Sequence, residues 1–155
     1  MPLAHANRRA TGNQRHHRHA ARRGYSPDIE IVTRARDIAQ ANNCEIRLLQ
    51  DPQAAVEGAD AVYTDVCVSM GFEHESTKRE PIFRPFQVNE ALMRKAAPHA
   101  VFMHCLPARR NAEVTDEVLD GPQSIVFDQA ENRMHCQKAL LLLLLGGLAN
   151  TASFQ

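Results

Sequence analysis

The feature that most constrains this chain is a short apolar run closed by a proline, VFMHCLP at residues 101–107. Its first three residues have the length and composition of a buried strand. Pro107 has no N–H for a sheet ladder, so the strand is expected to end before it. His104 and Cys105 should then lie at the carboxyl end of a strand, where open α/β sheets bind ligands. Alone, the pair is equally typical of a core strand, because free Cys often packs as a small hydrophobe.

Length and charge define the class of protein only broadly. The 155 residues suffice for one domain with a substantial core. Lys+Arg and Asp+Glu both number 18, so overall charge indicates no nucleic-acid partner. The four Cys form no C-x-x-C pair, and without a recognisable secretory signal we interpret them as reduced thiols of a cytoplasmic protein. The Leu run at 140–145 is far shorter than the roughly 20 apolar residues of a membrane span, so we predict no membrane contact and expect it to be the buried part of a terminal helix.

The first 23 residues differ in composition from the rest. They hold six Arg, four His and no acid, whereas residues 24–155 hold 12 basic and 18 acidic residues, a balance of −6. We predict a basic, disordered arm at 1–23 and a single domain at 24–155. A transit peptide, a nucleic-acid-binding arm and a metal-binding tract at 16–19 are alternatives for the arm.

Short β-type runs alternate with helical segments after the arm. A helix capped by Ser26 is expected to end at Asn42, and a long irregular loop is expected at 66–85. Strands are expected at 45–49, 61–64, 101–103 and 124–127, with helices at 52–56, 89–97, 116–119 and 129–145. The alternation predicts an α/β fold with a doubly wound parallel, Rossmann-like sheet. Because no strand is recognised before the first helix, the sheet should be incomplete at its amino-terminal edge.

Two expected strand ends bring candidate site residues to one crevice. Asp65 follows the strand at 61–64, and Cys105 follows the strand at 101–103. A carboxylate can hold an ammonium group by charge-assisted hydrogen bonds, and a thiol at a strand end can be polarised by nearby positive charge. Arg133, near the start of the closing helix, suits two-point binding of phosphate or carboxylate oxygens. The pattern therefore predicts a site for an amino acid beside an anion.

Three motifs resemble those of ornithine carbamoyltransferases, within the aspartate/ornithine carbamoyltransferase family. They are DVCVSMG at 65–71, HCLP at 104–107 and AENR at 130–133, in the family's order and spacing, and the resemblance runs from about 24 to 147. A QVN segment at 87–89 also resembles the family. The related aspartate enzymes usually have Pro in place of Cys105, which favours an ornithine-type enzyme.

The resemblance implies a transferase of arginine biosynthesis. Family members move the carbamoyl group of carbamoyl phosphate to the δ-amine of ornithine, giving citrulline and phosphate, without a metal or organic cofactor. They are homotrimers with shared sites, so pairing of this chain with full-length subunits is conceivable. Asp65, Ser69 and Met70 would bind the α-amino and carboxylate groups of ornithine.

The remaining site residues implied by the resemblance serve the reaction itself. Cys105 is the implied catalytic residue, and with Leu106 it would contact both the side-chain amine of ornithine and the carbamoyl group. Arg133 would bind carbamoyl phosphate. For His104, a structural role and a role in the site are left equally open.

The sequence also departs from the family. Cys67 stands where the family usually has Trp. The amino-terminal carbamoyl-phosphate domain, with its Ser-x-Arg-Thr-Arg loop, is absent, and residues 1–23 resemble nothing in the family. We therefore interpret the chain as a truncated fragment that is inactive alone. The alternatives are a carbamoyltransferase for putrescine or an acylated ornithine, and a non-catalytic fragment that binds an amino acid or pairs with other subunits.

Overall fold

The computed structural model describes residues 4–9, 15–20, 25–68, 71 and 73–146, with 4–9, 15–20 and 73 described by their backbone alone. Within these residues, one sheet has the strand order β3-β2-β1-β4-β5. Its strands are β1 (Ala4–Arg9), β2 (Arg15–Ala20), β3 (Cys44–Leu49), β4 (Ala61–Thr64) and β5 (Val101–His104). The pairs β2–β3 and β4–β5 are parallel, whereas β1 runs antiparallel to both neighbours. The sheet therefore contains parallel pairs joined by an antiparallel strand.

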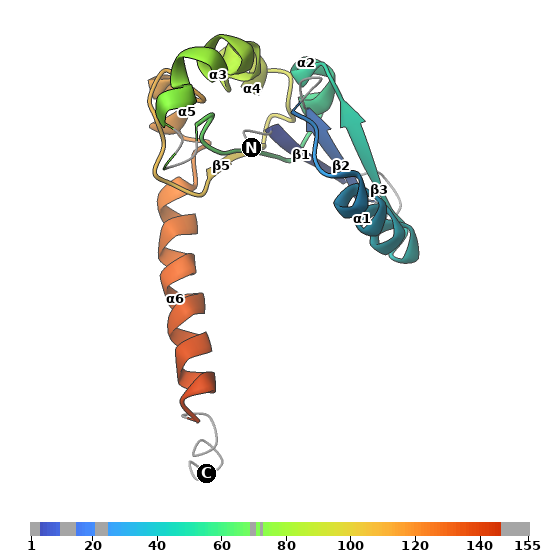
Figure 1. Ribbon diagram of the computed structural model, residues 1–155, viewed down its shortest axis with the longest axis vertical. Coiled ribbons are helices and arrows are strands. Elements are labelled where there is room, and N and C mark those ends of the chain that lie inside the picture. The colour runs from blue at the N-terminus through green and yellow to red at the C-terminus, as the bar shows by residue number, and fades with distance from the viewer. Residues whose placement is uncertain (1–3, 10–14, 21–24, 69–70, 72, 147–155) are drawn as a thin grey trace.

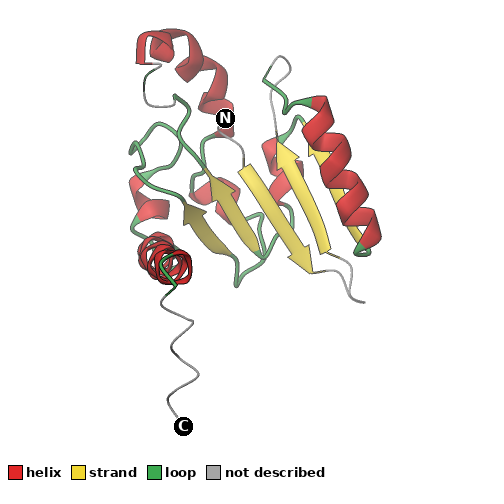
Figure 2. Cartoon of the chain, turned by 60° about the horizontal axis from the view of Figure 1, so that its bottom comes forward, coloured by secondary structure: helices red, strands yellow, loops and turns green. Residues whose placement is uncertain are grey.

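Helices alternate with the strands along the chain. They are α1 (Ile29–Ala41), α2 (Pro52–Val56), α3 (Ser76–Phe83), α4 (Glu90–Met93), α5 (Asp116–Leu119) and α6 (Val126–Leu144), with short 3-10 turns η1 (Glu73–Glu75) and η2 (Arg84–Phe86). Figure 2 shows α1 lying along one face of the sheet. The predicted α/β class is confirmed. In the described part of the chain, no helix has both the length and the apolar character to cross a bilayer.

Short polar side chains start the helices, as the sequence predicts, with one correction. Asp51 accepts a hydrogen bond from the N–H of Gln53 at 2.9 Å, and Asn89 caps α4 in the same way. The first helix is capped by Asp28, whose carboxylate accepts from the N–H of Glu30 at 2.8 Å. The expected cap, Ser26, lies two residues too early to reach these free N–H groups.

The arm is the largest difference from the sequence-based expectation. Disorder was expected for residues 1–23, and this is wrong for 4–9 and 15–20, which form β1 and β2. Backbone N–H and C=O groups pair without any apolar side-chain pattern, so composition alone did not reveal these strands. Because β2 precedes α1 and pairs in parallel with β3, the place expected to lack a strand is filled.

Two other predicted segments differ from the structure. The strand expected at 124–127 is reduced to one bridge between Ser124 and Phe102, because the helix α6 begins at Val126. A short apolar run cannot distinguish a buried strand from the start of a helix. The irregular loop expected at 66–85 contains α3, which tolerates Pro81 inside it.

The core lies around β4, β5 and the short helices that cover them. Val62 and Phe102, at the middle of these two strands, are fully buried. A first buried cluster joins them to α4, α5 and Val126, and a second gathers Cys67 with Phe83 and neighbouring apolar residues. The first cluster thus runs along both strands, and the second includes Cys67 and Val68, which follow β4.

The helix α6 projects away from this core (Figure 1). Among its residues, Val126 is the one that is buried. The Leu run at 140–145, expected to be buried, is 54 to 82% exposed. The expectation is wrong because, within the described residues, no element packs against the helix beyond its first turns.

Candidate functional site

The register of β4 and β5 brings Asp65 and Cys105 together. Thr64 and His104 are partners in the parallel ladder, so the next residue of each strand emerges at the same edge. The Cys105 Sγ donates a hydrogen bond to Asp65 Oδ1 at 3.1 Å. The same oxygen accepts from the N–H of Val66 at 2.7 Å. The predicted meeting of these two strand ends is confirmed, while the roles of the residues stay predictions.

The environment of Cys105 favours the neutral thiol. Burial raises its pKa, and the hydrogen bond to Asp65 raises it further. Tyr63 adjoins the same thiol, and its own pKa is raised to about 12, first by burial and then by its hydrogen bond with Cys105. Because both groups stay protonated at neutral pH, Cys105 serves as a hydrogen-bonding group here rather than as a ready nucleophile.

The turn after Cys105 has an uncommon backbone. Leu106 has a φ of +52°, and a cis peptide bond joins it to Pro107. Few residues other than Gly adopt a positive φ, so the surrounding structure has to hold it. The N–H of Leu106 donates to Nδ1 of His104 at 2.9 Å, and the ring of His104 is fully buried. Leu106 is half-buried beside Cys105.

The other predicted site residues are Ser69, Met70 and Arg133. Ser69 and Met70 lie outside the described residues. Arg133 is exposed, two turns into α6, and forms no ion pair with any residue that the structure describes. The structure thus places half of the predicted set, namely Asp65, Cys105 and Leu106, in one small region.

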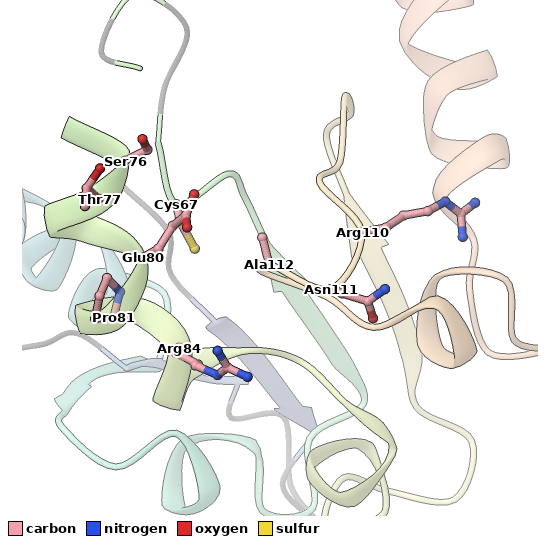
Figure 3. A pocket seen from close by; sticks show the side chains of 9 residues that line it. All are labelled: Cys67, Ser76, Thr77, Glu80, Pro81, Arg84, Arg110, Asn111 and Ala112. Atoms are coloured by element: carbon pink, nitrogen blue, oxygen red, sulfur yellow. The ribbon is translucent and has the colours of Figure 1, made fainter. Parts of the chain in front are cut away.

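A cavity of about 480 Å³ adjoins the segment after Asp65 (Figure 3). It lies between α3 and the turn at 110–112, and its lining residues are Cys67, Ser76, Thr77, Glu80, Pro81, Arg84, Arg110, Asn111 and Ala112. Neither Asp65 nor Cys105 lines it. Arg110 is already paired with Asp116 and Asp120 at 2.7 and 2.6 Å. The cavity is therefore a neighbour of the strand-end site and not the site itself.

Sequence reasoning missed three residues that shape the site. Tyr63 lies two positions before Asp65, and the period of two along a strand could have placed both on one face. Gln129, in the first turn of α6, accepts a hydrogen bond from the N–H of His104 at 3.1 Å. Glu113 is 1% exposed and approaches the His104 ring. No local pattern signals Glu113, because its burial depends on how the 105–113 segment folds back.

The described side chains form no group of three or more His, Cys, Asp or Glu able to hold a metal ion. The histidines of the possible metal-binding tract at 16–19 lie where the structure describes the backbone alone.

Fold and site together define an α/β domain that presents a hydrogen-bonded thiol and carboxyl group where two parallel strands end. The family model described as "Aspartate/ornithine carbamoyltransferase, Asp/Orn binding domain" matches residues 10–144, and the chain belongs to this family. The match begins inside the segment that was expected to resemble nothing in the family. The division of the chain at residues 23 and 24 stays a prediction.

Individual relatives agree with this assignment. The chain is 56% identical over 125 residues to the ornithine carbamoyltransferase of Methanothermobacter thermautotrophicus, covering 81% of this chain and 42% of that protein. The anabolic enzyme of Pyrococcus furiosus is 53% identical, with 81% and 40% covered. The solved ornithine carbamoyltransferase of Pyrococcus furiosus superposes with a TM-score of 0.76 at 52% identity, over 83% of this chain and 41% of that one. The chain thus spans about two-fifths of the length of these relatives.

Proposed function

We propose that this chain is the ornithine-binding part of an ornithine carbamoyltransferase. The observation that carries the proposal is the contact between Asp65 and Cys105 at adjacent strand ends. The carboxyl group and the thiol belong to two of the motifs that resemble the family, those at 65–71 and 104–107. The identity of more than 50% to ornithine carbamoyltransferases supports the same conclusion.

The proposed reaction is an acyl transfer. The neutral δ-amine of ornithine attacks the carbonyl carbon of carbamoyl phosphate, a C–N bond forms, and the C–O bond to phosphate breaks with its electron pair leaving on phosphate. The amine loses one proton to its surroundings, and citrulline and phosphate result. Cys105 and Leu106 would hold and orient the δ-amine, which general acid–base and proximity effects require.

The α-amino and carboxylate groups of ornithine are assigned to Asp65, Ser69 and Met70. A carboxylate next to small polar groups suits a zwitterionic amino acid. This assignment favours ornithine over putrescine, which has no carboxylate. A solved acetylornithine transcarbamylase is 35% identical to this chain with a TM-score of 0.66. Solved ornithine carbamoyltransferases are 32 to 52% identical to this chain, so the choice of ornithine over an acylated substrate depends on the site residues and not on identity.

Carbamoyl phosphate binding is proposed to depend mainly on another part of the family's proteins. Arg133 is the phosphate ligand that we assign within this chain, and it is exposed two turns into α6. A single Arg cannot replace several donors that stabilise developing charge on the leaving phosphate. We therefore expect the isolated chain to make no citrulline at a useful rate. The free thiols of the described residues are consistent with a cytoplasmic location, which we also propose.

Titration calorimetry of the purified chain tests this proposal. L-Ornithine should bind, putrescine should bind more weakly, and Asp65→Ala should abolish ornithine binding. Asp60→Ala is the control, because Asp60 lies just before β4 and pairs with His99 at 2.7 Å instead of Cys105. Equal binding of ornithine and putrescine would contradict the proposed substrate.

A second candidate function is pairing with full-length subunits of the same family. The exposed leucines at 140–145, at the end of α6, favour it, because a contiguous exposed apolar patch commonly marks a contact with another protein. The occupant we propose is the part of the family's chain that this sequence does not span. The family's trimeric assembly would provide the setting for such pairing.

A further inference from the structure

A buried histidine and glutamate lie beside the turn that carries Cys105 and Leu106. His104 is 0% exposed and Glu113 is 1% exposed, although most residues of these types lie at protein surfaces. His104 Nε2 and Glu113 Oε1 are 3.4 Å apart. Burying two such groups costs free energy unless they are held by partners. Their partners therefore indicate what the pair does.

Both side chains bind backbone N–H groups of the same turn. The N–H of Leu106 donates to His104 Nδ1 at 2.9 Å. The N–H of Arg109 donates to Glu113 Oε1. Leu106 lies near the start of the turn and Arg109 near its end. One buried pair thus holds the two ends of the turn that follows Cys105.

The hydrogen bond from Leu106 also fixes the form of the His104 ring. Because Nδ1 accepts that hydrogen bond, the proton of the neutral ring is on Nε2, which faces Glu113. Among the described residues, His104 Nε2 and Glu113 Oε2 have no hydrogen-bond partner of good geometry. The contact between the two side chains is therefore mainly electrostatic. The orientation of each side chain is fixed by its hydrogen bond to a backbone N–H of the turn.

We propose that His104 and Glu113 are positioning residues, which hold the 105–109 turn so that Cys105 faces Asp65 and Leu106 keeps its positive φ. The pair thereby sets where the substrate's side-chain amine is held. The inference deepens the proposed function and relies on it for the identity of that amine. The geometry of the turn, and its effect on the Cys105 thiol, can be measured without any substrate.

Two pairs of variants separate this role from simple packing. His104→Gln places its amide near the position of Nε2 and removes the acceptor for Leu106, whereas His104→Asn keeps an acceptor near the position of Nδ1. Glu113→Ala removes the acceptor for Arg109, and Glu113→Gln keeps one. His99→Gln is the matched control, since His99 pairs with an acid at 2.7 Å but is exposed and lies just before β5, at the other end of that strand from the turn.

The measurement is the alkylation rate of Cys105 by iodoacetamide, resolved by peptide mass spectrometry, with the exposed Cys136 of the same molecule as reference. The two variants that remove an acceptor, His104→Gln and Glu113→Ala (the loss variants), should free Cys105 from its contact with Asp65. Its alkylation should then become severalfold faster, because the thiol ionises more readily without that contact. The two variants that retain an acceptor, His104→Asn and Glu113→Gln (the keep variants), and His99→Gln should leave the Cys105 rate close to that of the wild type, because the contact with Asp65 persists.

Unchanged Cys105 rates in folded loss variants would overturn the proposal. So would equal acceleration in loss and keep variants, which would indicate packing alone. If the loss variants fail to fold, ¹⁵N NMR of the His104 ring in the wild-type chain decides. A proton on Nε2 supports the proposal, and a proton on Nδ1 overturns it. Ornithine is absent from these experiments, so a failed proposed function would leave their result unaffected.

Discussion

The strand-end site and the helix α6 differ in how their side chains are covered. At the ends of β4 and β5, Cys105 bonds Asp65 across the two strands, and His104 and Glu113 accept from N–H groups of the turn. Along α6, which at 1.5 Å per residue is about 28 Å long, Gln129 accepts a hydrogen bond from the N–H of His104, and every residue from 130 to 144 is exposed. The strand-end side chains are held by contacts among the described residues, whereas α6 ends in a run of exposed leucines.

This difference separates two sources of packing: contacts between neighbouring elements of this chain, and contacts with a surface outside the described residues. The strand-end site depends on short-range backbone geometry, namely two parallel strands in register and a turn tied by side chains. A covered α6 would depend on a surface that the described residues do not provide. The following predictions test whether the two regions are as different energetically as they are structurally.

The largest expected effect is loss of a buried side chain beneath the site. Phe102→Ala should lower the free energy of unfolding by about 3–5 kcal/mol, because it leaves a cavity in the core. Leu142→Ala on α6 should change it by less than about 0.5 kcal/mol, because its side chain is largely exposed. Urea unfolding followed by circular dichroism measures both. If Phe102→Ala does not fold, Phe102→Leu replaces it, and equal losses at the two positions would contradict the comparison.

The next largest effect is a fall in stability at alkaline pH, which we expect from the buried thiol of Cys67 and not from the exposed thiol of Cys136 on α6. Burial raises the pKa of Cys67 from 9.0 to about 12. Between these values the unfolded chain loses this proton while the folded chain keeps it, so stability falls as pH rises from 9 towards 12. The fall due to this group is at most about 4 kcal/mol, at 1.36 kcal/mol per pKa unit.

Unfolding free energies at a series of pH values measure this dependence. Cys67→Ala should flatten the alkaline decline, and Cys136→Ala should leave it unchanged, because Cys136 is exposed on α6. The same slope in both variants would show that Cys67 is not the titrating group.

The smallest effect on stability is expected from polar substitutions on α6. The double variant Leu141→Gln, Leu144→Gln should leave the unfolding free energy within about 0.5 kcal/mol of the wild type. It should nevertheless abolish co-purification with a tagged full-length ornithine carbamoyltransferase, if α6 is the surface that pairs. Glu131→Gln, an exposed change on the same helix, is the control. Retained co-purification of the double variant would exclude α6 as the docking surface.

The sequence predicts the strand-end site well because its signals are local. An apolar run ended by Pro107 and a second run followed by Asp65 place the two groups at one sheet edge, and the structure joins them at 3.1 Å. Glu113 was not predictable, because its burial results from a fold-back of the following segment. The strands β1 and β2 were not predicted either, because their pairing is made by backbone groups.

The exposure of α6 shows what the sequence does not predict, namely which surface covers an apolar segment. The run of leucines at 140–145 correctly predicts a helix, and apolar character also predicts burial. Burial, however, needs a second surface, and the composition of a helix says nothing about where that surface is. The same applies to Arg133, whose predicted role requires a phosphate to be brought to α6.

The most direct test of the central claim is protection of Cys105 by ornithine. Alkylation of Cys105 in the wild-type chain is followed with increasing L-ornithine, with Cys136 as internal reference. The account predicts that ornithine slows the reaction of Cys105 severalfold in a saturable way, leaves Cys136 unchanged, and has no effect in Asp65→Ala. An unchanged Cys105 rate at ornithine concentrations where calorimetry shows binding would contradict the claim that this strand-end site holds the amine.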